Sequence, residues 1–324
     1  MISRFPSDRR NLSGEDHLIL KVLRLYYERH LTQSEVARRM GFSRPKVSKL
    51  ISEGRSRGLV KIEIATPGED FAALEIAVED RHGLAEAVVA SSAGSREVTE
   101  LAVGASAAAV LGRICTRSTV LGVSWGRSSR ALADVVIPQV FPCEKVVPLV
   151  GGMGRAEAAL HSNQIAANLA EKLSAEALYL SAPAIAPSAQ SRAELMETPG
   201  IEDVLAEGAA CDVAVVGIGG ILSSSTLVGA GYFTPEEFLG LKEQAAVGDV
   251  CCHFLDAGGR PCLPGFSERV VGLTLEQLLA IPKVIGLATG AEKAESVAAA
   301  IKGGYVSTLV CDRELAEALL EIEG

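Results

Sequence analysis

The stretch from Leu31 to Gly58 reads LTQSEVARRMGFSRPKVSKLISEGRSRG and decides the fold of the amino-terminal part of the chain. Thr32 and Glu35 have the spacing of a capping box, in which the hydroxyl accepts from a first-turn amide and the carboxylate reaches back. A helix is therefore predicted to begin there. It should end at Gly41, because glycine tolerates the left-handed conformation of a tight helix exit.

A further helix is predicted directly after a short turn. Ser43 can cap it, and Pro45 falls in its first turn, where a missing backbone amide does no harm. Val47, Leu50 and Ile51 form its apolar inner face. Its outward residues are polar and mostly basic: Arg44, Lys46, Ser48, Lys49, Ser52 and Arg55. Two helices joined by a glycine turn, the later one exposing cations, predict a helix-turn-helix.

The flanking segments extend this pattern. Between Glu15 and His30 the apolar residues recur at helical spacing, which predicts a helix in front of the turn. After Gly58 the run Leu59–Ile64 alternates apolar and charged residues, the period of a half-buried strand. This strand predicts a winged variant of the helix-turn-helix.

The charge of the chain divides at the end of this strand. The net charge is −9, but residues 1–66 hold 14 Lys and Arg against 7 Asp and Glu, whereas residues 67–324 hold 17 against 33. A small basic part joined to a large acidic one is typical of a nucleic-acid-binding module fused to another domain. The alternative is a solvated cationic helix without a partner. The predicted contacts to double-stranded operator DNA are Gln33, Ser43, Arg44, Pro45, Lys46, Ser48, Lys49 and Arg55.

Composition excludes several other classes. A chain of 324 residues that is 48% hydrophobic and 22% charged is typical of a folded protein with a real core. Charges interrupt every apolar stretch before the roughly 18 residues that a membrane span needs. The seven cysteines are an odd number and contain no C-x-x-C pair. We expect a cytoplasmic protein with reduced thiols, no metal site, no cofactor and no membrane contact.

Beyond the polar linker Ala65–Asp70, strand and helix patterns alternate. The expected strands are 87–90, 119–123, 145–149, 177–180, 212–216, 249–255, 283–288 and 306–311. The expected helices are 98–114, 130–136, 163–173, 275–279, 292–301 and 314–320. This alternation predicts a parallel sheet covered on both faces. The predicted architecture is a winged helix-turn-helix over residues 1–66 and a doubly wound α/β domain over residues 67–324.

In such a sheet ligands bind at the carboxyl ends of the strands, and glycine marks several of the loops there. The loop Gly122–Ser128 is the richest, because Ser124 and Ser128 could donate to a phosphate that Arg127 neutralises. Trp125 could stack on a sugar or simply fill the core. Glycine lets backbone amides approach an anion, so these loops together suggest a phosphate cradle. The other loops are Gly151–Gly152, Gly217–Gly220 and Thr289–Lys293.

Catalytic motifs are not found. No loop matches a nucleotide-hydrolysing phosphate loop, and Gly217–Gly219 lacks the third glycine of a dinucleotide fingerprint. The five histidines are dispersed, and neither H-E-x-x-H nor G-x-S-x-G occurs. We therefore predict no catalytic residue. Asp249 at a strand start and Lys293 in a first helical turn could each orient a hydroxylated ligand, or be solvated charges.

Along nearly its whole length the sequence resembles the SorC family of sugar-responsive bacterial transcriptional regulators. Several motifs occur in the right order, which is more specific than any one of them. The matching stretches are Leu31–Gly58, Leu121–Leu132 (LGVSWGRSSRAL), Val146–Gly152 (VVPLVGG), Cys211–Gly220 (CDVAVVGIGG), Gly248–Gly259 (GDVCCHFLDAGG) and Ile281–Leu319.

The resemblance implies an effector domain akin to glucosamine-6-phosphate deaminase and ribose-5-phosphate isomerase. It also implies a sugar or sugar-phosphate effector and a homo-oligomer, with a tetramer built as a dimer of dimers favoured and a dimer left open. Ser128 and Ser129 stand where many members have Thr, and Cys251-Cys252 replaces small residues, differences that concern the ligand rather than the fold. By motif match the effector pocket would use Gly122, Ser124, Trp125, Gly126, Arg127, Ser128, Gly152, Gly217, Asp249 and Lys293.

Three functions are compared on these features. The favoured hypothesis is a DNA-binding transcriptional regulator of carbohydrate metabolism whose operator binding is modulated by a sugar or sugar phosphate. The alternative is a sugar-phosphate isomerase- or deaminase-like enzyme with an attached DNA-binding head, against which the missing histidine–carboxylate pair argues. A pure protein-interaction module explains neither the basic helix nor the glycine loops. The sequence leaves open which sugar binds, and whether the protein represses or activates.

Overall fold

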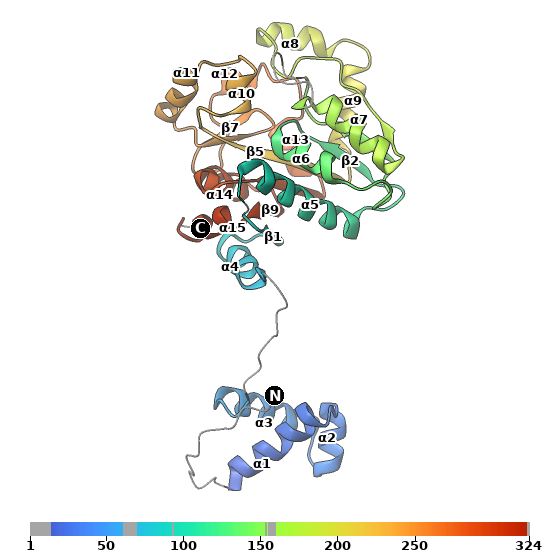
Figure 1. Ribbon diagram of the computed structural model, residues 1–324, viewed down its shortest axis with the longest axis vertical. Helices are drawn as coiled ribbons and strands as arrows, with labels where there is room; N and C mark the ends of the chain where they lie inside the picture. Colours follow the sequence, from blue (N-terminus) through green and yellow to red (C-terminus); the bar gives the residue numbers. More distant parts are fainter. Residues whose placement is uncertain (1–13, 61–69, 93, 153, 155–159, 323–324) are drawn as a thin grey trace. The chain divides into compact units, whose positions relative to one another are not determined.

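The computed structural model describes residues 14–60, 70–92, 94–152, 154 and 160–322 (Figure 1). The chain forms two compact units, Met1–Gly68 and Glu69–Gly324, and each is described by itself. Within the described ranges, no helix combines the length and the apolar character that crossing a membrane would require.

The first unit is a small helical domain. Helix α1 (Gly14–Leu23) continues into a π-helical turn, η1 (Arg24–Glu28), and is followed by α2 (Gln33–Met40) and α3 (Arg44–Ser56). The predicted capping box is present, because Thr32 Oγ1 accepts the Glu35 amide at 3.3 Å and Glu35 Oε2 accepts the Thr32 amide at 2.8 Å. The predicted helix-turn-helix is confirmed, whereas residues 61–64 of the predicted wing lie outside the described residues.

Apolar side chains from all three helices form the core of this unit. They are Ile19, Val22, Leu23, Val36, Ala37, Val47, Leu50 and Ile51. Helices α1 and α3 come close together at Gly54, where an added Cβ would lie 2.7 Å from Leu23 Cδ1. The core therefore holds α3 by its inner face and leaves the outer face to solvent.

The second unit is built on a parallel sheet. Its strands follow the order β1 (Glu86–Ala90), β9 (Thr308–Asp312), β8 (Lys283–Ala288), β5 (Val213–Gly220), β2 (Val120–Val123), β3 (Lys145–Pro148) and β4 (Glu176–Ala177). Every neighbouring pair along this path is parallel. The doubly wound α/β architecture is therefore confirmed.

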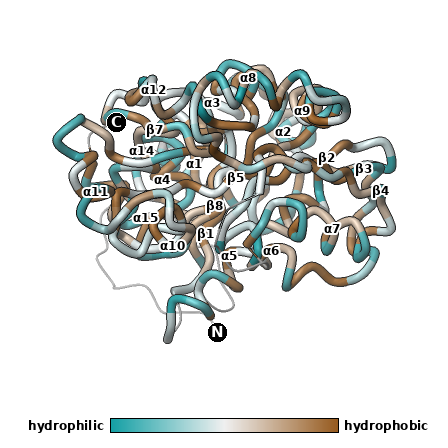
Figure 2. The backbone as a smooth tube through the Cα atoms, turned by 90° about the horizontal axis from the view of Figure 1, so that it is seen from above, coloured by the Kyte–Doolittle hydropathy of each residue, from teal (hydrophilic) through white to brown (hydrophobic). Residues whose placement is uncertain are grey.

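Helices cover both faces of this sheet (Figures 1 and 2). Val213 and Val215 of β5 pack in one core cluster, with α5 (Arg96–Ile114), α6 (Arg127–Val135) and α7 (Ser162–Leu173). Ala214 and Val216 face the other cluster, because successive strand residues point to opposite faces. The helices on that side are α4 (Ala72–His82), α9 (Ile201–Ala209), α13 (Leu275–Ala280), α14 (Ala294–Lys302) and α15 (Arg313–Leu320).

One predicted strand is wrong. The segment 249–255 is not a single strand but a hairpin of β6 (Gly248–Val250) and β7 (His253–Leu255), with β6 antiparallel to the end of β5. Its two turn residues, Cys251 and Cys252, have positive φ values of 49° and 67°. A two-residue hairpin turn requires that conformation, but its usual sequence signal is glycine or asparagine, which this segment lacks.

Short helices after β5 were not predicted from the sequence. They surround a third apolar cluster that contains Trp125 and Phe254. The elements concerned are α10 (Thr226–Gly229), α11 (Pro235–Gly240) and α12 (Pro264–Ser267); α8 (Ala189–Met196), which precedes β5, was not predicted either and packs against a different cluster. The chain leaves β2 through α6 toward β3, whereas it leaves β5 toward β8 on the other side. The carboxyl ends of β2 and β5 therefore meet at the switch point of the sheet, where ligands bind in folds of this kind.

Candidate functional site

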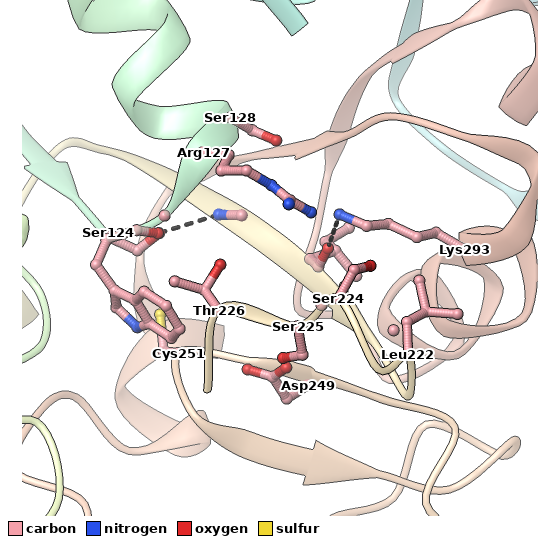
Figure 3. A pocket seen from close by; sticks show the side chains of 16 residues that line it. Ser124, Arg127, Ser128, Leu222, Ser224, Ser225, Thr226, Asp249, Cys251 and Lys293 are labelled. Carbon is pink, nitrogen blue, oxygen red and sulfur yellow. Dashed lines mark hydrogen bonds between the residues drawn. The ribbon is translucent and has the colours of Figure 1, made fainter. Parts of the chain in front are cut away.

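A cavity lies at this switch point, between the loops that leave β2 and β5 (Figure 3). It is completed by the hairpin β6–β7 and by Lys293, the last residue of η4 (Ala291–Lys293). Residues from distant parts of the chain thus come together. The predicted effector residues that line it are Ser124, Trp125, Gly126, Arg127, Ser128, Gly217, Asp249 and Lys293.

The amino end of α6 forms one wall of the cavity. Gly126 precedes the helix at φ 114°, a conformation that other residues adopt only with strain, and no side chain caps the first turn. The first amides of an α-helix have no acceptor within the helix and carry the positive end of its dipole. Because Arg127 and Ser128 belong to that turn and line the cavity, this wall is suited to an anion.

Two cationic side chains extend toward each other on the same side of the cavity, Arg127 and Lys293 (Figure 3). Lys293 Nζ donates to the Ile218 carbonyl oxygen at 2.9 Å. Burial, followed by the positive charges of Arg96 and Arg127, lowers the pKa of Lys293 to about 8. Close cations that destabilise each other are stabilised by a bound anion, so the electrostatics agree with the geometry.

A buried carboxyl group, that of Asp249, lies on the other side of the cavity (Figure 3). Asp249 is paired with Gly219 across the β5–β6 ladder, and its Oδ1 would lie 2.0 Å from a Cβ added at Gly219. Its Oδ2 accepts the Cys252 amide at 3.2 Å. Burial raises the pKa of Asp249 to about 6, although that hydrogen bond and Lys293 oppose the rise. This carboxyl group can accept hydrogen bonds from ligand hydroxyls.

Ser124 is mainly a structural residue. Its Oγ accepts the Gly217 amide at 3.0 Å, and its own amide donates to the Val215 carbonyl at 2.9 Å. These bonds tie the loop after β2 to β5. Trp125 lines the cavity and also packs with Cys252 in the third apolar cluster.

Gly122 and Gly152 do not line the cavity. An added Cβ at Gly122 would lie 2.5 Å from Leu149 Cδ2 and 2.9 Å from Cys211 Sγ, so this glycine makes room for core packing. Gly152 forms a bridge with Pro183 instead. These two predicted effector residues therefore lie outside this cavity, because their backbones approach other parts of the protein.

Known proteins resemble this chain over almost its full length. Residues 67–321 match the family described as "Putative sugar-binding domain", and residues 20–57 match sigma-70 region 4. The sorbitol operon regulator of Klebsiella pneumoniae is 33% identical over 95% of this chain and 99% of its own, and the deoxyribonucleoside regulator of Bacillus subtilis is 29% identical over 94% and 98%. The full-length structure of that sorbitol operon regulator, SorC, matches with a TM-score of 0.73, at 31% identity, over 95% of this chain and all of the other.

The chain belongs to the SorC family. It is a DNA-binding transcriptional regulator that couples a helix-turn-helix to a sugar-binding domain. The family and the fold predicted from the sequence are confirmed.

The helix-turn-helix of this SorC-family regulator exposes most of the residues predicted to contact DNA. Gln33 is half-buried; Ser43, Arg44, Pro45, Lys46, Ser48, Lys49 and Arg55 are exposed. Two of them are held by aromatic side chains, since Lys46 Nζ lies 4.1 Å from the ring centroid of Phe42 and Arg55 Nε donates to the Tyr27 hydroxyl at 2.7 Å. Two of the cations of α3 thus have aromatic partners on the exposed face of this helix.

Sequence reasoning missed part of the cavity of this SorC-family protein. Ser224, Ser225 and Thr226, around the start of α10, line it, as do Leu222 and Cys251. A signal was present, because the four hydroxyl residues Ser223–Thr226 follow the glycine-rich end of β5 almost at once. Hydroxyl side chains at the carboxyl end of a central parallel strand suit a polar ligand.

Proposed function

We propose that the cavity of this regulator binds a phosphorylated sugar, and that this ligand changes the affinity of the outer face of α3 for operator DNA. One observation carries the proposal. The open first turn of α6, Arg127 and Lys293 converge on one side of the cavity, and the carboxyl group of Asp249 lies on the other. The first group suits a phosphate, and the second suits sugar hydroxyls.

The division of charge supports a single orientation of the ligand. A phosphate gains charge-assisted hydrogen bonds from Arg127, Lys293 and the helix amides. It would be repelled by an ionised Asp249, which accepts hydrogen bonds from hydroxyls. The hydroxyl groups of Ser224 and Thr226 lie between these two sides (Figure 3). A free sugar would use only the second set of contacts, so a sugar phosphate fits better.

The DNA contacts proposed are Gln33, Ser43, Arg44, Pro45, Lys46, Ser48, Lys49 and Arg55. The regulator is proposed to act in the cytoplasm as a homotetramer, a dimer of dimers. A ligand that binds one quaternary arrangement better than another shifts the population toward it, and the spacing of the DNA-binding units follows.

A second function, turnover of a sugar phosphate, is favoured by one observation. The pKa of Asp249 is raised to about 6 and that of Lys293 is lowered to about 8, and perturbed pairs of this kind occur in catalytic sites. We propose that the pair binds rather than catalyses. Incubation of the protein with ribose 5-phosphate and glucosamine 6-phosphate, followed by product analysis, separates the two functions, and turnover that Asp249→Asn abolishes would establish the enzyme.

The test of the regulator is a titration of operator binding against a panel of sugar phosphates, measured by fluorescence anisotropy of labelled DNA. Arg127→Ala should bind the operator as the wild type does without ligand, but should lose the response to ligand. Arg113→Ala is the matched control, because it removes an arginine that pairs with Glu86 and does not line the cavity. An Arg127→Ala protein that responds at the wild-type concentration would exclude this cavity.

A further inference from the structure

One carboxylate beside the cavity, that of Glu100 on α5, contacts two arginines at once. Its Oε1 lies 3.4 Å from Arg127 Nε and 3.2 Å from Arg96 Nε, and its side chain is only 12% exposed. Arg96 in turn pairs with Glu292 at 2.9 Å. Of the two carboxylates in this ion-pair network, Glu100 is the one that contacts Arg127, the predicted ligand of the phosphate.

The position of Glu100 relates it to the cavity in a second way. It lines a neighbouring cleft of about 560 Å³, which shares Arg127 and the Ser224–Thr226 loop with the cavity. Its charge also reaches the other cation of the cavity, because Glu100 is among the groups that raise the pKa of Lys293. Glu100 thus contacts two cations, Arg96 and Arg127, and favours the charged form of a third, Lys293.

We propose that Glu100 is the resident counter-ion of the phosphate site and competes with the effector for Arg127. The inference rests on the proposed function. Without ligand, Glu100 neutralises cations that would otherwise repel one another. A ligand phosphate must share Arg127 with this carboxylate or take its place, and it meets the negative charge of Glu100 as it enters. Glu100 therefore stabilises the empty site and weakens the binding of anions.

The competition sets a threshold for the effector. A carboxylate attached to α5 is present at the site at all times, so a ligand of equal or smaller charge gains little by replacing it. A phosphate monoester brings more negative charge and more acceptor oxygens, and the amides of α6 favour it as well. Glu100 thereby tunes the concentration at which a sugar phosphate is sensed, and a neutral sugar is indifferent to it.

The test uses the full-length chain with inorganic phosphate as the probe. Trp125 is the only tryptophan of the chain and lines the cavity, so its fluorescence reports occupancy. Glu100→Gln should melt at a lower temperature than the wild type without phosphate, and should bind phosphate at least about tenfold more tightly. Glu97→Gln is the matched control, because it removes the same charge from the same helix and cleft, and no ion pair joins Glu97 to Arg127 within the described residues.

Each outcome of this experiment decides the inference. Equal or weaker phosphate binding by Glu100→Gln would overturn it, because Glu100 would then only position Arg127. An equal gain in Glu97→Gln would overturn it too, since the effect would be one of general charge. If Glu100→Gln does not fold, Glu100→Asp is used instead, because its shorter side chain keeps the negative charge but moves it away from Arg127. This variant should bind phosphate more tightly than the wild type, by a smaller factor than is expected for Glu100→Gln. Arg127→Ala tests the cavity itself and should lose phosphate binding. If Arg127→Ala binds phosphate as the wild type does, the proposed function fails, whatever the result for Glu100→Gln.

Discussion

The carboxyl group of Asp249 should cost the folded protein stability, and Asp249→Asn measures how much. Burial raises its pKa from 3.8 to about 6, so the folded state disfavours the ionised form that the unfolded chain adopts. Because the folded-state pKa is raised, the cost is absent below the unfolded-state pKa and grows as the pH rises through the interval between the two values. Above the folded-state pKa it amounts to about 3 kcal/mol.

Asparagine is neutral at every pH and can still accept the Cys252 amide. We therefore expect Asp249→Asn to raise the free energy of unfolding by about 2–3 kcal/mol near pH 8, by roughly half of that near pH 5, and by little below pH 4. Urea unfolding followed by Trp125 fluorescence measures this difference at each pH. A variant that is less stable than the wild type near pH 8, or a difference that does not change with pH, would refute the reasoning.

Two further predictions concern the two units separately. The triple variant Arg44→Ala/Lys46→Ala/Lys49→Ala should stay folded and bind the operator more weakly. The dependence of operator affinity on salt, measured by fluorescence anisotropy, should lose roughly one unit of slope for each side chain that had bound a DNA phosphate. Unchanged operator affinity would exclude α3 as the reading helix. Gly219→Ala should destabilise the second unit by about 1–3 kcal/mol in urea unfolding, because the new Cβ displaces the Asp249 carboxyl group. The same displacement should weaken the response of operator binding to the effector. A wild-type response would contradict the placement of Asp249 in the effector site.

Local signals explain which parts of the fold could be predicted. The helix-turn-helix depends on neighbours in sequence, since Thr32 caps with Glu35 and Gly41 ends α2 at φ 69°. Strands such as β8, predicted at 283–288 and found there, are short apolar runs between turn signals. Within the hairpin at Cys251-Cys252, Asp249 accepts the Cys252 amide, and from outside it Trp125 packs with Cys252 in the third apolar cluster. Tertiary contacts impose a turn there that no local signal predicts.

The residues of the candidate site, too, could be predicted from the sequence only in part. A glycine in a parallel strand indicates a close approach of some group, but the sequence does not say of which. At Gly219 that group is the Asp249 carboxyl, inside the cavity, whereas at Gly122 it is the side chain of Leu149, in the core. Likewise a serine after a strand predicts a polar ligand, yet the hydroxyl of Ser124 is engaged by the amide of Gly217. Sequence position located the cavity and could not assign each side chain its partner.

The energetics of Asp249 and Glu100 bear on how a ligand can act at all. An ionised Asp249 costs the folded protein about 3 kcal/mol, a penalty that stability alone does not explain. A sugar whose hydroxyl groups donate hydrogen bonds to this carboxylate would offset part of the penalty on binding. A ligand at one hundred times its dissociation constant stabilises the protein by about 2.7 kcal/mol, which is of the same size. The empty site is thus held at higher energy by Asp249 on the sugar side, whereas on the phosphate side Glu100 stabilises the empty site and sets a cost that the ligand phosphate must exceed. Effector binding relieves the penalty at Asp249, and the interaction energy that exceeds the cost at Glu100 is available to favour the arrangement of the protein to which the effector binds best.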